Sequence, residues 1–278
     1  MSDPLLRLAA WTRPEVTQVG RLPMRSPLLP APDVATARDG DAANPWVRSL
    51  DGRWRFRLVD APSAAPKRFM DPDHRDRGWD EVDVPGLWTM QGYDRPIYTN
   101  VQMPFRGVPP EVPAENPTGL YRTRFKVPKA WKGRRIVLHV GAADSVLHVW
   151  VNGHAVGISK DSRLEAAFDV TDHVHQGENL LALMVVRWSD ASYVEDQDQW
   201  WHAGIGRGVY LTATDTGWIA DVHAHGDWDG ARGSLRVRTE VGFASRPHRG
   251  WSVRTQLETT GGRRVGTPAT DAVATDRR

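Results

Sequence analysis

The chain has 278 residues, which is enough for one large β domain and part of a second. Its 36 basic and 34 acidic residues leave a net charge of +2 with no Lys/Arg block, which excludes a nucleic-acid-binding footprint. The absence of cysteine excludes disulfide bridges and thiolate metal sites. Since there is no basic and apolar leader and no apolar run of membrane-spanning length, we expect a cytoplasmic protein with no membrane partner.

Residues 1–44 are rich in Pro, Ala, Asp and Arg and show no sustained hydrophobic period. This pattern predicts an extended N-terminal arm. Ordered structure is expected to begin at Asn44-Pro45-Trp46.

Short segments of alternating or continuous apolar residues follow, separated by Gly and Pro turns, and predict strands. Asn152-Gly153 lies between two of them, and this pair indicates a tight hairpin because a type I′ turn needs positive φ at both central residues. Many short strands without a long amphipathic helix predict an all-β fold, a jelly-roll β-sandwich over residues 45–216. The clearest strands are predicted at residues 54–58, 120–127, 135–140, 146–151, 155–158, 180–186 and 209–214.

The strand pattern restarts after about Thr216, with predicted strands at residues 219–225, 234–241 and 251–257. Residues 267–278 are polar and predict no closing strand. An immunoglobulin-like sandwich needs about seven strands. We therefore expect residues 217–278 to form an incomplete immunoglobulin-like β-sandwich, with the chain ending inside a domain.

Tryptophan is in excess, with 13 Trp against 5 Tyr and 6 Phe. Indole faces stack on the C–H faces of sugars, so the excess is typical of carbohydrate binding. The alternative is that these side chains fill the core of a large sandwich.

Seven strings in this sequence resemble the bacterial β-galactosidases of glycoside hydrolase family 2, and they occur in the family order over residues 14–211. They are Pro14-Glu15-Val16-Thr17-Gln18-Val19, Leu50-Asp51-Gly52-Arg53-Trp54-Arg55-Phe56, the stretch from Gly92 to Val101, Glu115-Asn116-Pro117-Thr118-Gly119, Trp150-Val151-Asn152-Gly153, Asp161-Ser162-Arg163-Leu164 and the stretch from Arg187 to Asp198.

The resemblance implies a galactose-binding jelly roll followed by part of an immunoglobulin-like sandwich. In that family a (β/α)₈ barrel carries the catalytic glutamates, and these have no counterpart here. The expectation is an N-terminal part of a β-galactosidase that contains no catalytic residue and works with the barrel of the same polypeptide. Magnesium is expected only in that barrel.

Glu195-Asp196-Gln197-Asp198 is the densest acidic cluster. By itself it could be a solvated loop, or it could suggest the acid and nucleophile of a retaining glycosidase, which lie about 5 Å apart. The resemblance implies instead that Asp198 accepts hydrogen bonds from galactose hydroxyls and helps to ligate a sodium ion. A carboxylate suits both tasks, being an acceptor and a hard oxygen ligand.

Asn100 is the second candidate for substrate binding. It could be a turn residue, whereas the resemblance implies that its amide reaches the barrel mouth and bonds sugar hydroxyls. Trp200 and Trp201 could line the sugar site or pack beneath the Asp198 loop. Near them the sequence departs from the family, with Gln199 in place of Met and with Gly206 and Gly208 in place of larger side chains.

His223 and His225 lie two apart on a predicted strand and therefore share a face. They could form a zinc pair or simply a solvated or packed face, since no third ligand is evident. The chain contains no P-loop, no dinucleotide-binding glycine motif and no G-x-S-x-G sequence.

The resemblance implies hydrolysis of terminal non-reducing β-D-galactose residues with retention, on a β-galactoside such as lactose, with intact relatives often homo-oligomeric. This chain would supply one wall of the sugar site and a sodium ligand. The alternative is a free-standing, non-catalytic carbohydrate-binding module that shares the jelly roll.

Overall fold

The computed structural model describes residues 3–40, 44–245 and 250–274. The chain divides into two compact units, one of Met1–Met24 with Leu29–Ala213 and one of Arg25–Leu28 with Thr214–Arg278. No helix within these described ranges is long and apolar enough to cross a membrane.

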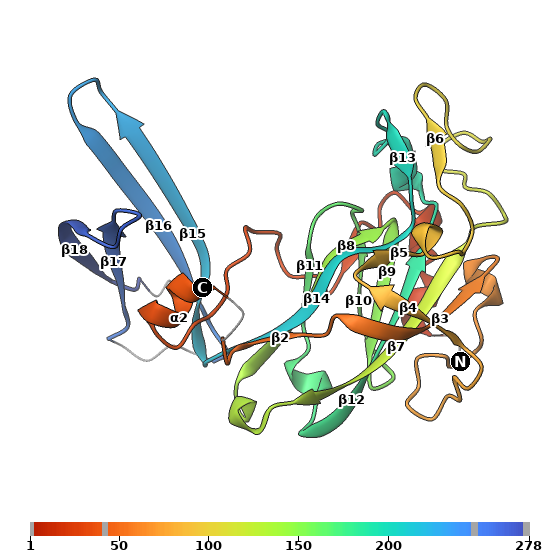
Figure 1. Cartoon of the computed structure of the whole chain (residues 1–278), viewed down its shortest axis with the longest axis horizontal. Coiled ribbons are helices and arrows are strands. Elements are labelled where there is room, and N and C mark those ends of the chain that lie inside the picture. Colours follow the sequence, from red (N-terminus) through yellow and green to blue (C-terminus); the bar gives the residue numbers. More distant parts are fainter. Residues whose placement is uncertain (1–2, 41–43, 246–249, 275–278) are drawn as a thin grey trace. The chain divides into compact units, whose positions relative to one another are not determined.

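The first unit is a β-sandwich, as predicted (Figure 1). A seven-stranded sheet has the order β1-β10-β9-β12-β7-β3-β4, and a second sheet has the order β11-β8-β14-β2 with β5 paired to β14. The strands of the first sheet are β1 (Gln18–Val19), β3 (Gly52–Val59), β4 (Asp80–Val84), β7 (Thr118–Val127), β9 (Val146–Val151), β10 (His154–Lys160) and β12 (Gly177–Val186). Those of the second are β2 (Val47–Ser49), β5 (Gly86–Leu87), β8 (Arg135–Asp144), β11 (Ala166–Asp169) and β14 (Gly204–Thr214).

The continuous apolar run of β12 is explained by burial on both faces of its sheet. Leu181, Leu183 and Val185 belong to the core between the two sheets. Their neighbours Ala182, Met184 and Val186 belong to a second apolar cluster on the outer face. A strand that is covered on both sides has no solvent-facing position, so the alternation of polar and apolar residues is absent.

The hairpin predicted at Asn152-Gly153 joins β9 to β10, with His154 opposite Val151. Both turn residues have positive φ, 52° at Asn152 and 80° at Gly153. These values are what a type I′ turn requires, which is why the Asn-Gly pair predicts it.

Short helices form where the sequence predicts only an extended arm. α1 (Pro4–Arg7) begins after Asp3, whose side chain accepts hydrogen bonds from the backbone N–H groups of Leu5 and Leu6. α2 (Val34–Asp39) is capped in the same way by Asp33. An acidic N-cap next to Pro is a helix start signal that outweighs the lack of a hydrophobic period. The remaining short helices are η1 (Ala10–Thr12), η2 (Pro62–Ala64), η3 (Trp88–Met90), η4 (Lys129–Trp131), η5 (Thr171–His173) and η6 (Asp190–Tyr193).

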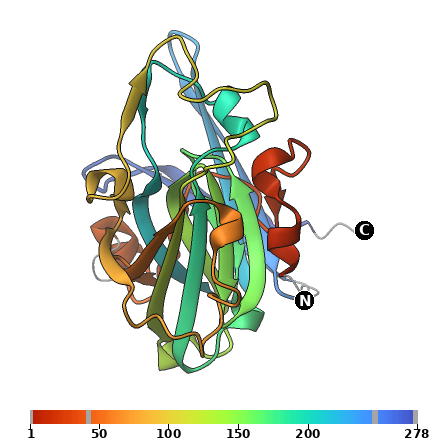
Figure 2. The ribbon, with the colours of Figure 1, turned by 90° about the vertical axis from the view of Figure 1, so that its right-hand side faces the viewer.

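The segment containing α1 and η1 packs on the outer face of the seven-stranded sheet (Figure 2). The Asp3 carboxylate accepts a hydrogen bond from Nε1 of Trp150 at 2.9 Å. The buried Lys160 donates from Nζ to the carbonyl oxygens of Ala10 at 3.0 Å and Arg13 at 2.8 Å. This packing supplies the second apolar layer that buries β12.

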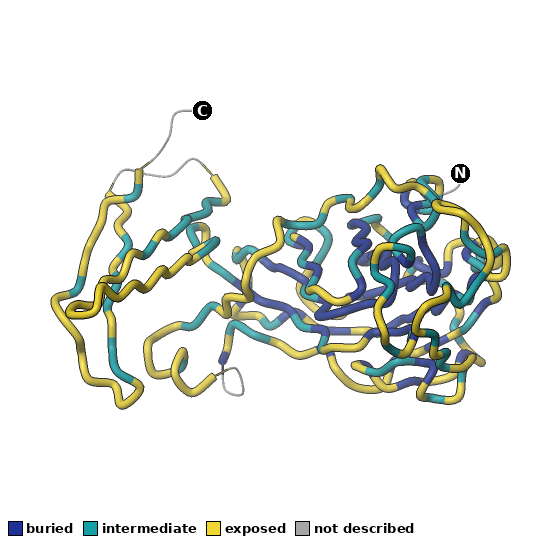
Figure 3. The backbone as a smooth tube through the Cα atoms, turned by 90° about the horizontal axis from the view of Figure 1, so that it is seen from above, coloured by how far each residue is buried: buried dark blue, intermediate teal, exposed yellow. Residues whose placement is uncertain are grey.

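The second unit consists of two hairpins, β15 (Gly217–Trp228) with β16 (Gly233–Phe243) and β17 (Ser252–Glu258) with β18 (Arg264–Ala272). The first three strands agree with the sequence predictions. The expectation that residues 267–278 contain no strand was wrong, because β18 pairs along β17 and extends to Ala272. The four strands described here are fewer than the seven or so of an immunoglobulin-like sandwich, and most of their residues are exposed (Figure 3).

Candidate functional site

A two-stranded ribbon brings the two predicted sugar-binding residues together. β6 (Ile97–Thr99) pairs antiparallel with β13 (Gln199–Trp201), with Tyr98 opposite Trp200. Asn100 directly follows β6 and Asp198 directly precedes β13. The two candidates, far apart in sequence, therefore lie at the same end of the ribbon, which Figure 1 shows as a yellow and a teal strand rising beside the sandwich.

Four side chains gather at this end of the ribbon. The pairing ends with Thr99 opposite Gln199, Asn100 and Asp198 are the next residues of the two segments, and the side chains of both interact with the phenol of Tyr98. Tyr98 and Trp200 are about half exposed, at 51% and 54%, and their ring centroids are 5.5 Å apart. This group thus combines an exposed aromatic pair with an amide and a carboxylate, and we call these four residues the ribbon face.

The hydroxyl of Tyr98 donates a 2.6 Å hydrogen bond to Oδ1 of Asp198. This bond to the carboxylate is the main reason that the pKa of Tyr98 lies above its ordinary value, while the side chain of Asn100 acts on the same phenol in the opposite direction. The three polar groups of the ribbon face therefore interact with one another. Sequence reasoning missed Tyr98, although its position two residues before Asn100 in a strand was a signal that the two share a face.

Trp201 lies on the opposite face from Trp200. It is only 7% exposed, its Nε1 donates to Oγ1 of Thr99 at 2.7 Å, and its ring packs edge-on against Trp188 with centroids 5.6 Å apart. Each tryptophan thus fits a different one of the two alternatives, lining the sugar site or packing beneath the loop. Trp200 is available to a ligand on the ribbon face, and Trp201 packs beneath it.

Arg187 supports the ribbon from below and is a second residue that sequence reasoning did not single out. Its side chain is 1% exposed and forms an ion pair with Asp94. Nη2 donates to the carbonyl oxygens of Arg95 and Trp201, both at 3.1 Å. One buried guanidinium thereby joins the segment before β6 to the end of β13, which fixes both strands to the sandwich.

The acidic cluster does not form a catalytic carboxylate pair. Both oxygens of Glu195 are engaged by Ser162, whose backbone N–H donates to Oε1 at 3.0 Å and whose hydroxyl donates to Oε2 at 2.5 Å. Asp198 is exposed and faces Tyr98 instead. Among the described residues no group of three or more His, Cys, Asp or Glu side chains could hold a metal ion.

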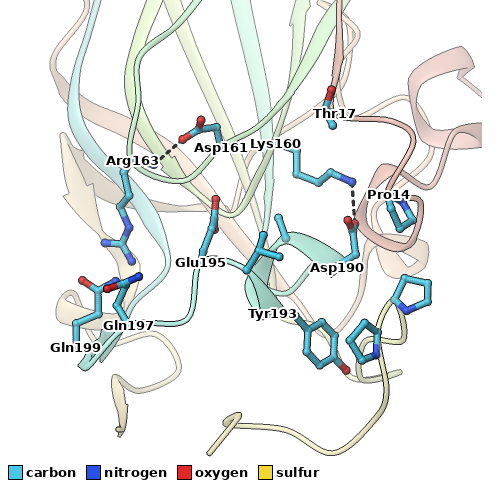
Figure 4. A pocket seen from close by; sticks show the side chains of 14 residues that line it. Pro14, Thr17, Lys160, Asp161, Arg163, Asp190, Tyr193, Glu195, Gln197 and Gln199 are labelled. Carbon is cyan, nitrogen blue, oxygen red and sulfur yellow. Dashed lines mark hydrogen bonds and ion pairs between the residues drawn. The ribbon is translucent and has the colours of Figure 1, made fainter. Parts of the chain in front are cut away.

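A hollow of about 950 Å³ lies beside the segment that carries Asp198. Its wall includes Gln197 and Gln199, which alternate with Asp198 along the chain, together with Tyr193, Glu195 and Arg163 (Figure 4). Gln199, where the sequence departs from the family, therefore lines the hollow.

The carboxyl group of Asp144 lies at the edge of the same region. Burial raises its pKa to about 7, with Glu195 adding to this shift and Arg163 opposing it. Nη1 of Arg163 lies 3.8 Å from Oδ2 of Asp144. No pattern in the sequence indicated Asp144 as a candidate functional residue.

His223 and His225 lie in β15 of the second unit, opposite Arg238 and Arg236 of β16. Both histidines are exposed. Arginine cross-strand neighbours are cations that repel a metal ion, which favours a solvated face over a zinc pair.

Comparison with protein families gives a match over most of the first unit. The profile described as "Glycosyl hydrolases family 2, sugar binding domain" matches residues 47–215. Among curated proteins, a "Beta-galactosidase" of Photobacterium profundum is 44% identical over 245 residues, covering 87% of this chain and 23% of that protein. A "Beta-galactosidase" of Vibrio cholerae is 46% identical over 203 residues, covering 72% of this chain and 20% of that protein. The chain thus spans about a quarter of the length of these relatives.

Among solved structures, a beta-glucuronidase of Bacteroides uniformis superposes with a TM-score of 0.66 at 19% identity, covering 82% of this chain and 26% of that one. A beta-glycosidase of Bacteroides vulgatus gives a TM-score of 0.62 at 20% identity, covering 81% and 27%. At this level of identity the similarity establishes the fold.

Proposed function

The chain belongs to glycoside hydrolase family 2, and from this premise we propose that it is the sugar-binding part of a retaining β-galactosidase. Its substrate class would be β-D-galactosides such as lactose, cleaved at a terminal non-reducing galactose. The observation that carries this proposal is the ribbon face, in which Asn100 and Asp198 both interact with Tyr98 beside an exposed aromatic pair.

The chemistry of the ribbon face suits a sugar. The carboxylate of Asp198 can only accept hydrogen bonds, whereas the amide of Asn100 can donate and accept, so together they match neighbouring hydroxyl groups. Tyr98 takes one of the lone-pair sites of the Asp198 carboxylate, and the remaining sites can accept hydrogen bonds from a ligand. The ring of Trp200 would cover the C–H face of a sugar bound there.

Bond cleavage is assigned to residues outside this chain. A retaining glycosidase needs two carboxyl groups about 5 Å apart, one of which attacks the anomeric carbon. Glu195 is committed to Ser162 and Asp198 to Tyr98, which supports a role in binding for this acidic cluster. The chain would form one wall of a site that a barrel completes.

A sodium ion is proposed at the same place. The carboxylate of Asp198 is a hard oxygen ligand, which fits an alkali cation. It would supply one ligand of the coordination shell, and the ion would position a sugar hydroxyl by direct coordination. Magnesium is assigned to the barrel.

The second candidate function is a free-standing carbohydrate-binding module. It is favoured by the exposure of Tyr98 and Trp200, since an open aromatic pair binds sugars without further protein. The two functions differ in the affinity they need. A module must bind galactosides by itself, whereas one wall of a shared site need not.

The test is a chimaera in which residues 14–211 replace the matching part of the Photobacterium profundum β-galactosidase. We expect hydrolysis of a chromogenic β-galactoside with the β-anomer of galactose released first, measured by proton NMR. Asn100→Ala and Asp198→Ala should each reduce kcat/KM, while Glu178→Ala, at an exposed position in β12 away from the ribbon, serves as the control. A chimaera that folds and binds no galactoside would contradict the proposal.

A further inference from the structure

We propose that Glu195 is a positioning residue, which acts through Ser162 to fix the loop that carries Asp198. The inference deepens the proposed function, on which the sugar-binding role of Asp198 rests. It assigns a task to the carboxylate of the acidic cluster that bonds Ser162.

The loop between η6 and β13 is fastened to the β10–β11 turn by two side-chain bridges. Nζ of Lys160 forms an ion pair of 2.7 Å with Oδ1 of Asp190 at the start of η6. Glu195 accepts the two hydrogen bonds of Ser162 described above. Figure 4 shows Asp190 and Glu195 projecting from one segment toward the strand end that carries Lys160 and Asp161.

The anchor on the sandwich side is rigid. Ser162 is 2% exposed and Lys160 is 8% exposed. The turn itself is closed by the carboxylate of Asp161, which accepts hydrogen bonds from the backbone N–H groups of Arg163 at 3.3 Å and Leu164 at 3.2 Å. A turn that is bonded internally and whose Ser162 is buried gives Glu195 a fixed point to hold.

The distance from the anchor to Asp198 is short. Only Asp196 and Gln197 lie between the two residues, and three extended residues span at most about 10 Å. The segment is tightened further by a 2.7 Å hydrogen bond from the Gln199 backbone N–H to the Gln197 carbonyl oxygen. Because the connecting segment is short, a displacement of Glu195 is expected to displace Asp198 as well.

The turn that Glu195 holds also carries a cation. Nη1 of Arg163, the residue after Ser162, lies 3.8 Å from Oδ2 of Asp144. Burial raises the pKa of Asp144, Arg163 opposes this shift and Glu195 adds to it. Ser162 and Arg163 therefore tie the same turn to Glu195 and to Asp144.

Amide hydrogen exchange of the 278-residue chain, followed by NMR or mass spectrometry, tests the anchor without any sugar. Glu195→Ala should speed exchange about tenfold or more over residues 196–201 and 97–100, because it removes two hydrogen bonds to a charged group. Ser162→Ala, which removes one of them, should have a smaller effect at the same residues. Glu195→Gln keeps the shape and can still bond Ser162, so exchange should return to within about threefold of the wild type.

The matched control is Glu178→Ala, since this exposed glutamate pairs with Arg124 at 3.0 Å on the other end of β12. It should leave exchange of the ribbon unchanged. Faster exchange throughout the strands of the first unit in Glu195→Ala would mean a general loss of stability and would overturn the positioning role, as would unchanged exchange in the ribbon. In the chimaera, Glu195→Ala should raise KM more than it lowers kcat, with rescue by Glu195→Gln. A chimaera without galactosidase activity refutes the proposed function, whereas the exchange pattern decides the anchor independently.

Discussion

Oδ1 of Asp198 accepts a 2.6 Å hydrogen bond from the phenol of Tyr98, its neighbour across the ribbon. This contact orients the carboxylate that we assign to the sugar, and the exposed carboxylate keeps further lone-pair sites for a ligand. It also makes Tyr98 a reporter of the state of Asp198, because the ionised phenol would be repelled by the carboxylate.

The first prediction concerns the titration of Tyr98. Its pKa is raised above the ordinary tyrosine value, chiefly by the hydrogen bond to Asp198. Asp198→Asn removes the negative charge and should bring this pKa down, as followed by NMR of the ring or by absorbance of tyrosinate. Asp196→Asn is the control and should leave the titration where it is. An identical titration in both variants would show that the Tyr98–Asp198 bond does not persist in solution.

The second prediction concerns the activity of this chain alone. We expect no hydrolysis of a chromogenic β-galactoside above background, because no described carboxyl pair is placed to act as acid and nucleophile. A purified 1–278 chain is assayed beside an unrelated protein prepared in the same way. Turnover that disappears in a Glu195 or Asp198 variant would place the catalytic machinery in this chain and overturn the domain assignment.

The third prediction concerns sugar affinity. Galactose should bind with millimolar affinity or weaker, which corresponds to about −4 kcal/mol at best. Asn100 and Asp198 offer few contacts on an open face where water competes for the same groups. Calorimetry or NMR titration measures this, with Trp200→Ala expected to abolish the remaining binding. Micromolar affinity would favour the free-standing binding module.

The sandwich could be predicted from the sequence because its signals are local. Alternation in β3, the apolar run of β12 and the Asn152-Gly153 turn each follow from one short stretch of residues. β18 was missed because its side chains are mostly polar, and it forms only by pairing with β17. The capped helix α1 was missed although Asp3-Pro4 is a helix start signal that could have revealed it.

The site was predictable only in part, because its members meet through tertiary pairing. The resemblance implies Asn100 and Asp198, but their juxtaposition depends on β6 pairing with β13 across a hundred residues. The same pairing separates Trp200 from Trp201, which sequence alone treats as equivalent. Pairs of residues that are distant in sequence, such as Ser162 and Glu195, cannot be identified from the hydrophobic periodicity of the sequence.

The fourth prediction compares two acids of the same loop in the chimaera. Asp198→Ala should lower kcat/KM tenfold or more, because the sugar and the sodium ion would lose a partner in a site that the barrel closes. An unsatisfied polar group in such a site costs about 1–3 kcal/mol. Asp196→Ala should cost little, because Asp196 has no assigned contact with sugar or sodium. Sodium dependence should weaken in the Asp198 variant alone. Equal losses in the two variants, or an unchanged sodium response, would mean that Asp198 is not the residue that binds the sugar and the sodium ion.

The last prediction concerns His148 in β9, which is fully buried beneath the N-terminal segment. Its ring lies between Trp11 and Trp150, with centroids 6.0 Å from each. Neither ring nitrogen has a hydrogen-bond partner among the described residues. Burial therefore lowers the pKa of His148 to about 3, because the charged imidazolium would lose its hydration without compensation.

A folded pKa below the unfolded value of about 6.5 means that the unfolded chain binds this proton first as the pH falls. The stabilisation is complete above pH 6.5 and is lost progressively down to about pH 3. Between pH 7 and pH 5 the free energy of unfolding should drop by about 2 kcal/mol on account of this residue. His148→Phe cannot titrate, so its urea unfolding should show a smaller drop over that interval. His154→Phe, at an exposed position in β10, is the control and should retain the full drop. A wild-type chain equally stable at pH 5 and pH 7 would mean that the protonated ring of His148 reaches a hydrogen-bond acceptor or water in the folded state.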